Sequence, residues 1–377
     1  MSDGGRMRGG RKADGRGSDG RIEDRLATRG GAVELLRGPA LLFGLAARLR
    51  GRLYDRRLLP IHRLEAPVVC VGNLTAGGTG KTPFVRWLAD WFRARGWRPG
   101  VLSRGYRAEG DGDDGGDEAR MLARALGDLP AVQDADRVRG GRRLVEQGVD
   151  VVLLDDGFQH RRLHRDRDLV LVDATRPWGL PADDAGAAVR ALLPRGLLRE
   201  PPRALRRADA IVVTRSDQVA GAVLEALEAE LLRLAPGAPI ARARHAPVGL
   251  RGVGDPSRWP LERLAGREVD LVSGIGNPEA FERTVVSLGA RVREHRRLPD
   301  HHAYRGPELA GLGVGGAAVV TTAKDAVKLE ALLPGALALE IALELDSGAA
   351  PIEALLESIP PGRRQRERRA LHEGLHG

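Results

Sequence analysis

The sequence has little of what several classes of protein require. Cys70 is the only cysteine among 377 residues, so no internal disulfide can form and a zinc site built from cysteines is excluded. No run reaches the ~20 apolar residues that span a bilayer. Residues 1–30 have no apolar core of the kind found in a signal peptide. We therefore expect a protein that is kept in the reducing environment of the cytoplasm.

Lysine and aromatic residues are also scarce. Only four of the 60 basic residues are lysines, and 51 acidic residues leave a formal net charge of +9. A basic protein can bind nucleic acid or an anionic membrane, but folds that stack bases need aromatic side chains, which make up 3% of this chain. We expect no nucleic-acid partner, because a basic nucleic-acid-binding ATPase would be supported only by the net charge and by residues 1–30.

The chain is long enough for two domains, preceded by two segments of different character. Residues 1–30 are rich in Gly, Arg and Asp and have almost nothing to bury, which predicts a disordered tail. Residues 31–60 hold leucines at helical spacing, followed by arginines, and Pro39 suits a first helical turn. This amphipathic helix, expected over 39–57, could pack on the domain behind it or lie in a membrane interface with its arginines on anionic headgroups.

From residue 61 onward, apolar runs that end in polar residues alternate with helical patterns. Such runs are typical of a parallel sheet that is covered on both faces. The expected strands are 66–73, 99–106, 150–156, 168–174 and 208–217, and the expected helices are 82–96, 121–128, 138–148 and 223–234. The pattern restarts with 239–245, 268–276, 278–290 and 317–325. We predict an α/β fold with a sheet sandwiched by helices over 61–234 and a smaller α/β lobe over 235–377 that closes a cleft.

Residues 72–83, GNLTAGGTGKTP, stand between a predicted strand and a predicted helix. The amides of such a turn and the N-terminus of the helix bind phosphate. Lys81 would reach the β- and γ-phosphates, and the Thr82 hydroxyl would bind Mg²⁺. In the common phosphate-loop pattern G-x-x-x-x-G-K-[ST], the first glycine position is occupied here by Thr75. The loop resembles instead the deviant form xGGxGKT, whose first residue is usually a lysine. Ala76 stands at that position, which excludes the dimeric partitioning ATPases that need this lysine. We predict a P-loop NTPase core that binds ATP through Thr75, Ala76, Gly77, Gly78, Thr79, Gly80, Lys81 and Thr82.

An acidic strand end is the expected partner of this loop. The run DVVLLDD closes with Asp155 and Asp156, about seventy residues after the loop. Carboxylates at this place hold Mg²⁺ directly or through water. One acid is enough for the metal, and the other could cap a helix or pair with Arg161 or Arg162.

Seven further motifs indicate the phosphoryl acceptor. They are SRGY (103–106), GDE (116–118), DDGFQHRRLHRD (155–166), LLPRGLLREP (192–201), SGIGNP (273–278), LPDHH (298–302) and TTAKDAVKL (321–329). Together and in this order, from about residue 35 to 345, they resemble the tetraacyldisaccharide 4'-kinase family of lipid A biosynthesis. The resemblance implies transfer of the ATP γ-phosphoryl group to the 4'-hydroxyl of an acylated glucosamine disaccharide 1-phosphate. It also implies a membrane-associated enzyme at the cytoplasmic face of the bacterial inner membrane, without an obligate protein partner.

The resemblance implies roles for individual residues. A sugar hydroxyl needs a base as its proton leaves, and the family pattern assigns this role to Asp117, with His301 beside it; Lys81 completes the catalytic set. Asp117 lies in an acid-rich loop and could be merely solvated, and His302 could replace His301. Arg104 and Arg199 are candidates to clamp phosphate charge, although each could be a surface ion pair.

A rival hypothesis is a regulatory or metal-insertion NTPase that acts on a protein partner. TRSD at 214–217 is similar to the base-reading motifs of GTPases, but a helix cap by Ser216 or Asp217 explains it equally well. A switch protein would need a residue that positions water and would not need a leucine–arginine helix. We therefore expect ATP as the nucleotide and a lipid sugar as the acceptor.

Overall fold

The structure, a computed structural model, describes residues 22–27, 30–105, 127–183, 186–255, 257–300, 302–362 and 365–366. Its strands are β1 (Val68–Gly72), β2 (Pro99–Ser103), β3 (Ala131–Gln133), β4 (Val151–Asp155), β5 (Arg167–Asp173), β6 (Ala210–Thr214), β7 (Ile240–Gly252), β8 (Arg258–Trp259), β9 (Glu268–Ser273), β10 (Arg291–Arg297), β11 (Ala318–Thr322) and β12 (Leu337–Ser347). Its α-helices are α1 (Ile22–Ala27), α2 (Arg37–Asp55), α3 (Lys81–Ala94), α5 (Arg137–Glu146), α6 (Gly221–Leu234), α7 (Pro278–Ser287), α8 (Gly306–Leu309), α9 (Ala323–Leu329) and α10 (Ala349–Glu357). Short 3-10 helices cover Gly31–Leu36, Pro202–Arg207, Ser216–Gln218, Leu261–Leu264 and Val314–Gly316.

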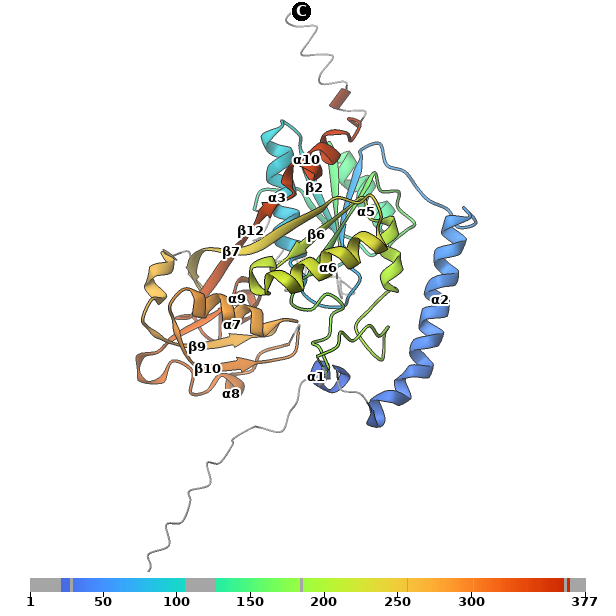
Figure 1. The fold of residues 1–377 in the computed structure, drawn as a ribbon. Helices are drawn as coiled ribbons and strands as arrows, with labels where there is room; N and C mark the ends of the chain where they lie inside the picture. Colours follow the sequence, from blue (N-terminus) through green and yellow to red (C-terminus); the bar gives the residue numbers. More distant parts are fainter. Residues whose placement is uncertain are drawn as a thin grey trace, which may run out of the picture.

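All these strands belong to one sheet with the order β10-β9-β11-β12-β7-β6-β5-β1-β4-β2-β3, and β8 pairs with β7. Every pair from β7 to β3 is parallel, and so is every pair from β10 to β12. The one antiparallel pair of the main path is β7 with β12. We call the strands from β7 to β3 the first block and those from β12 to β10 the second block. Figure 1 shows the long strands β7 and β12 running side by side from one block into the other.

The register of β7 and β12 determines how the carboxyl ends of the strands in the two blocks are placed. The last residue of β6 lies beside Ala243 of β7. The last residue of β11 lies beside Leu339 of β12, and Leu339 is paired with Leu250 of β7. Because β7 and β12 run in opposite directions, the carboxyl ends of the two blocks point toward each other. Six residues of β7 separate them, which is about 20 Å along a strand. Loops from both carboxyl edges meet in this space, the place where α/β sheets bind ligands.

Side chains of the first-block strands point alternately to the two faces of the sheet and form an apolar layer on each face. Val68 and Cys70 of β1 point into a cluster that is covered by α5 and α6. Val69 and Val71 point to the other face, which is covered by Phe84 and Leu88 of α3 and by α10. A strand that is buried on both faces explains the unbroken apolar runs in the sequence. In the second block, α7 and α9 cover opposite faces in the same way.

The predicted strands and helices of residues 61–234 are present, except that 121–128 lies outside the described residues. The elements β3, β8, β10, β12, α8, α9 and α10 were not predicted, and β7 extends beyond the expected 239–245. Helix α2 covers the predicted 39–57 almost completely. Of the tail predicted to be disordered, residues 1–21, 28 and 29 lie outside the described residues, whereas residues 22–27 form helix α1, which the sequence did not predict. The boundary at residue 235 stays a proposal, and the last part of the chain, from Leu343 to Ile359, packs in the core of the first block.

Candidate active site

The loop between β1 and α3 is built as a phosphate loop. Gly77 has φ 126° and Gly80 has φ 85°, backbone conformations that favour glycine. Among the described residues, none accepts a hydrogen bond from the amides of residues 77–80, whereas the Ala76 amide donates to the Leu197 carbonyl at 2.7 Å. The loop thus offers four consecutive amides next to the N-terminus of a 14-residue helix, an arrangement that binds anions.

The carbonyls of this loop are held from β6. Thr214 donates its hydroxyl to the Thr79 carbonyl at 3.1 Å, and the Arg215 guanidinium donates to the Gly78 carbonyl at 3.4 Å. In a planar trans peptide the N–H points opposite to the C=O. Holding these two carbonyls toward β6 therefore turns the amides of Thr79 and Gly80 away from β6. TRSD thus contributes to the shape of the phosphate loop.

Lys81 lies between the loop and the acidic strand end. Its ammonium group donates to the Asn73 side-chain oxygen at 3.2 Å and is 3.5 Å from the Asp156 carboxylate. Gln159 donates to the Asn73 carbonyl at 3.0 Å. These contacts keep an ammonium group beside the free amides, where a triphosphate would need it.

The two aspartates after β4 have different surroundings. Asp156, at φ 53°, accepts two hydrogen bonds of 2.8 Å from Arg199. Burial favours its neutral form, but Lys81 and Arg199 outweigh burial and lower the pKa of Asp156. Burial raises the pKa of Asp155 to about 6, against the attraction of Lys81. One carboxyl oxygen of Asp155 is buried, with no hydrogen-bond partner among the described residues.

This orphaned oxygen is what a Mg²⁺ site in a P-loop protein would use. The magnesium ion prefers one or two carboxylates together with phosphate oxygens and water, and no cluster of three or more His, Cys, Asp or Glu side chains exists in the described part of the chain. Asp155 is therefore the acid that fits the metal, with the Thr82 hydroxyl at the start of α3. The alternative pairing of the second acid with Arg161 or Arg162 is wrong, since these arginines bind Asp55 and Asp136.

The predicted arginines lie on this edge in different ways. Arg199 is engaged with Asp156, so it can reach a phosphate only by sharing or exchanging that carboxylate. Arg104 is exposed just after β2, and burial together with the charge of Arg104 lowers the pKa of Arg137. Burial and surrounding arginines lower the pKa of His160 to about 4, so this imidazole is neutral at physiological pH.

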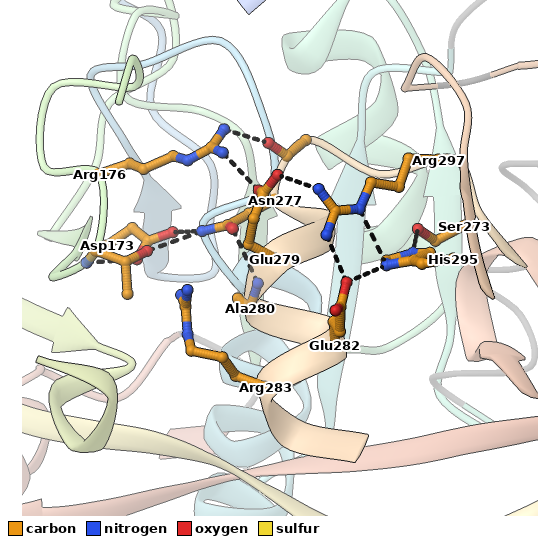
Figure 2. Close-up of polar contacts among 12 residues, drawn as sticks. Asp173, Arg176, Ser273, Asn277, Glu279, Ala280, Glu282, Arg283, His295 and Arg297 are labelled. Atoms are coloured by element: carbon orange, nitrogen blue, oxygen red, sulfur yellow. Dashed lines mark hydrogen bonds and ion pairs between the residues drawn. The ribbon is translucent and has the colours of Figure 1, made fainter. Parts of the chain in front are cut away.

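Loops of the second block complete the site. A Cβ at Gly276 of SGIGNP would lie 3.0 Å from the Gly78 amide nitrogen. On the side of the first block, a Cβ at Gly80 would lie 2.3 Å from the ring of His245 on β7. Asn277 and Glu279 at the start of α7 bind Asp173, the last residue of β5, and Arg176, three residues later (Figure 2). The second block therefore touches the phosphate loop directly.

The predicted base and its histidine cannot be located. Asp117 and His301 both lie outside the described residues. The flanking Asp300 accepts a hydrogen bond of 2.5 Å from Lys324, and His302 is 2.9 Å from Glu308. His302, the alternative to His301, is thus already engaged with a carboxylate of its own block.

Four residues of the site were not singled out from the sequence: Asn73, Asp173, His245 and Asn277. Asp173 carried a usable signal, because it ends an apolar run in the same way as Asp155. Asn277 also did, since it precedes Pro278 at a helix start, and its side chain caps α7 by accepting from the Ala280 amide at 3.1 Å. His245 lies inside a strand whose register no local pattern shows.

Comparison with known proteins decides the family. The family model described as Tetraacyldisaccharide-1-P 4'-kinase matches residues 32–359. The chain belongs to this family. The resemblance predicted from the motifs is thereby confirmed, together with the kinase class, and the regulatory or metal-insertion NTPase is not favoured.

Individual relatives support the assignment. The chain is 42% identical to a tetraacyldisaccharide 4'-kinase of Syntrophus aciditrophicus, over 77% of this chain and 82% of that protein. It is 41% identical to that of Anaeromyxobacter sp. strain K, over 88% and 93%. A crystal structure of LpxK from Aquifex aeolicus in complex with ATP matches with a TM-score of 0.67 and 31% identity, over 87% of this chain and 99% of that chain. The predicted α/β fold is confirmed by this match.

In the described part of the chain, no helix combines the length and apolar character needed to cross a bilayer. The exposed leucines of α2 are nevertheless concentrated on one stretch. The most exposed are Leu41 (70%), Leu42 (71%), Leu45 (61%) and Leu49 (59%).

Proposed function

We propose that this protein transfers the γ-phosphoryl group of ATP to the 4'-hydroxyl of a tetraacyldisaccharide 1-phosphate. The observation that supports the proposal best is the phosphate loop, in a chain of the tetraacyldisaccharide-1-P 4'-kinase family. Its amides at residues 77–80 have no acceptor among the described residues, and the Lys81 ammonium group lies beside the acidic end of β4. The product is lipid IVA, and the reaction is a late step of lipid A synthesis.

The residues of the first block divide the work on the nucleotide. The loop amides from Gly77 onward and Lys81 bind the phosphates, with Thr75 and Ala76 holding the start of the loop. Thr82 and Asp155 would hold Mg²⁺, which when bound neutralises charge on the transferred group. Asp156 keeps Lys81 and Arg199 in place. Arg104, which is exposed directly after β2, adds positive charge at the carboxyl edge of the first block.

The acceptor hydroxyl needs a base. We assign this role to Asp117, with His301 orienting or sharing the proton, because the family motif places an acid and a histidine at these positions. In sequence, Asp117 lies between β2 and β3 of the first block, and His301 lies between β10 of the second block and α8. Closure of the space between the two carboxyl edges would then bring the base to the terminal phosphate.

The lipid acceptor suggests where the enzyme works. Helix α2 presents its leucines to solvent while arginines follow them along the helix, and its C-terminal half is fixed to the first block by Arg161, which donates to the Gly51 carbonyl at 2.9 Å and to Asp55 at 2.8 Å. We infer that one end of α2 docks on the protein and the other enters the cytoplasmic face of the inner membrane. No protein partner is needed for this reaction.

One assay tests the function. The purified chain is incubated with γ-labelled ATP, Mg²⁺ and the tetraacyl disaccharide 1-phosphate in detergent, and the labelled products are separated. Label in the lipid is expected. Label found only in inorganic phosphate, in reactions where the lipid is intact, would instead indicate an NTPase and reject the kinase.

The base can be tested separately from nucleotide binding. The Asp117→Ala change removes the proton acceptor but no phosphate contact, so turnover should fall by a factor of 10² or more while the dissociation constant of MgATP stays within about twofold. Glu118→Ala, in the same motif, is the matched control. Wild-type turnover in Asp117→Ala would show that another group takes the proton.

A further inference from the structure

A buried polar cluster joins the two blocks beside the phosphate loop, and the proposed reaction gives no role to Asp173 or Asn277 at its centre. Its centre is the Asp173 carboxylate at the end of β5, whose side chain is 5% exposed. One oxygen accepts from the Thr175 amide at 3.0 Å and from its hydroxyl at 2.7 Å. The other accepts from Arg215 of the first block and, at 3.1 Å, from Asn277 of the second block.

Asn277 serves both blocks with one side chain. Its amide oxygen caps α7, and its NH₂ group donates to Asp173 and, at 2.8 Å, to the Thr175 hydroxyl. Figure 2 shows this side chain at the start of α7, directed to Asp173. An asparagine can do this because its side chain ends in a carbonyl oxygen that accepts and an NH₂ group that donates hydrogen bonds. Aspartate would cap the helix equally well but could not donate.

A second link runs parallel to the first. Arg176 donates to the Gly276 carbonyl at 3.2 Å and to Glu279 at 2.6 Å, and Arg297 of β10 binds the other oxygen of Glu279 at 3.1 Å. These contacts hold the loop before α7 against the first block. Gly276 has no side chain at the place where it meets the Gly78 amide nitrogen. The loop before α7 therefore lies directly on the phosphate loop.

The cluster reaches the phosphate loop through Arg215. The guanidinium is held by Asp173 and donates to the Gly78 carbonyl, and the direction of that carbonyl sets the direction of the Thr79 amide. Burial opposes the charge on Asp173, but Arg215, Thr175 and Asn277 outweigh burial and lower its pKa. A carboxylate that stays ionised can hold Arg215 and Asn277 at the same time.

We propose that Asn277 is a positioning residue that couples the second block to the phosphate loop through Asp173 and Arg215. It sets the direction of loop amides that bind the triphosphate and makes tight ATP binding depend on the docked position of α7. The proposal rests on the proposed function only in taking ATP as the nucleotide of this loop. It concerns the donor site and not the lipid site.

The test is the Asn277→Asp variant of the full chain. This change keeps the cap of α7 but places a second carboxylate against Asp173. Isothermal titration with MgATP should show a dissociation constant about tenfold higher, the size of a typical coupling between sites. Steady-state assays should show the same rise in KM for ATP, with KM for the lipid within twofold of wild type. Arg291→Ala, which removes a contact inside the second block, is the control and should change neither value.

An exchange variant distinguishes coupling from simple damage. Asp173→Asn combined with Asn277→Asp restores a donor facing an acceptor between these two positions and keeps a single carboxylate in the cluster. It should return the dissociation constant to within about threefold of wild type. Unchanged MgATP binding in Asn277→Asp, equal losses for both substrates, or an exchange variant as weak as the single one would each overturn the proposal. Because titration needs no lipid, a chain that binds MgATP but makes no lipid product would reject the kinase and leave this test intact.

Discussion

Asp155 and Asp156 show that neighbouring carboxylates of one motif can differ in function. The sequence presents them as equivalent acids after a strand. In the structure Arg199 and Lys81 neutralise Asp156, whereas one buried oxygen of Asp155 has no hydrogen-bond partner in the part of the chain that the structure describes. A motif predicts that an acid stands at this place, but which of the two serves the metal depends on Arg199, a residue 43 positions away.

The pH dependence of stability should report the Asp155 carboxyl. Its pKa is about 6 in the folded protein and close to 3.9 in the unfolded chain, so the folded state binds this proton more tightly. Its contribution to stability is complete below pH 4 and is lost as the pH rises through 6, by about 3 kcal/mol at most. Asp155→Asn should therefore unfold at a higher urea concentration than wild type at pH 7 in the absence of Mg²⁺, and the difference should vanish near pH 4.

The same variant should bind MgATP less tightly, because an amide is a weaker magnesium ligand than a carboxylate. Asp156→Asn provides the comparison: it leaves Arg199 without its carboxylate and should lose stability at pH 7. If Asp155→Asn were no more stable than wild type at pH 7, the charged Asp155 carboxylate would not destabilise the folded protein as we propose.

At the scale of elements, burial decided what could be predicted. The strands β1, β4, β5 and β6 are apolar on both faces, so composition alone marked them. β10 (RVREHRR) is a half-exposed edge strand rich in charge, and β12 (LALEIALELDS) is built largely from residues that also favour helices. β12 is paired with β7, which is distant in sequence, and no local pattern contains that information.

Helix α2 was predicted from its leucine spacing, and its exposed leucines lead to a prediction about membranes. The triple change of Leu41, Leu45 and Leu49 to Gln should reduce sedimentation of the protein with anionic liposomes at least tenfold, because each leucine buried in the interface contributes about 1 kcal/mol or more. Since these side chains are exposed in the protein, thermal unfolding should shift by no more than a few degrees. Equal changes at Val223 and Leu232 of α6, which are also exposed, are the control, and undiminished sedimentation of the triple variant would remove α2 from the membrane contact.

At the scale of the whole molecule, the continuous sheet makes the two blocks less separable than the sequence suggests. A restart of the strand–helix pattern near residue 235 predicts a second lobe. The chain returns from that lobe along β12, however, and α10 packs beside α3 (Figure 1). The facing of the two carboxyl edges, on which the site depends, follows from the antiparallel β7–β12 pair, and a pairing of strands some 90 residues apart cannot be deduced from either strand alone.

This return of the chain predicts how truncations behave. Ile352, Leu356 and Ile359 are at most 3% exposed and pack in one cluster with Phe84 and Leu88. Removing three buried side chains of this size costs roughly 6 kcal/mol or more, which is comparable to the whole stability of a domain. A chain ending at residue 348 should therefore lack a cooperative unfolding transition and accumulate in inclusion bodies, although every residue of the phosphate loop is present. A chain ending at residue 366 keeps α10 and should melt within a few degrees of the full protein. If the chain ending at residue 348 instead melted cooperatively and bound MgATP, α10 would not be required for the folding of the first block, and the blocks would be independent domains.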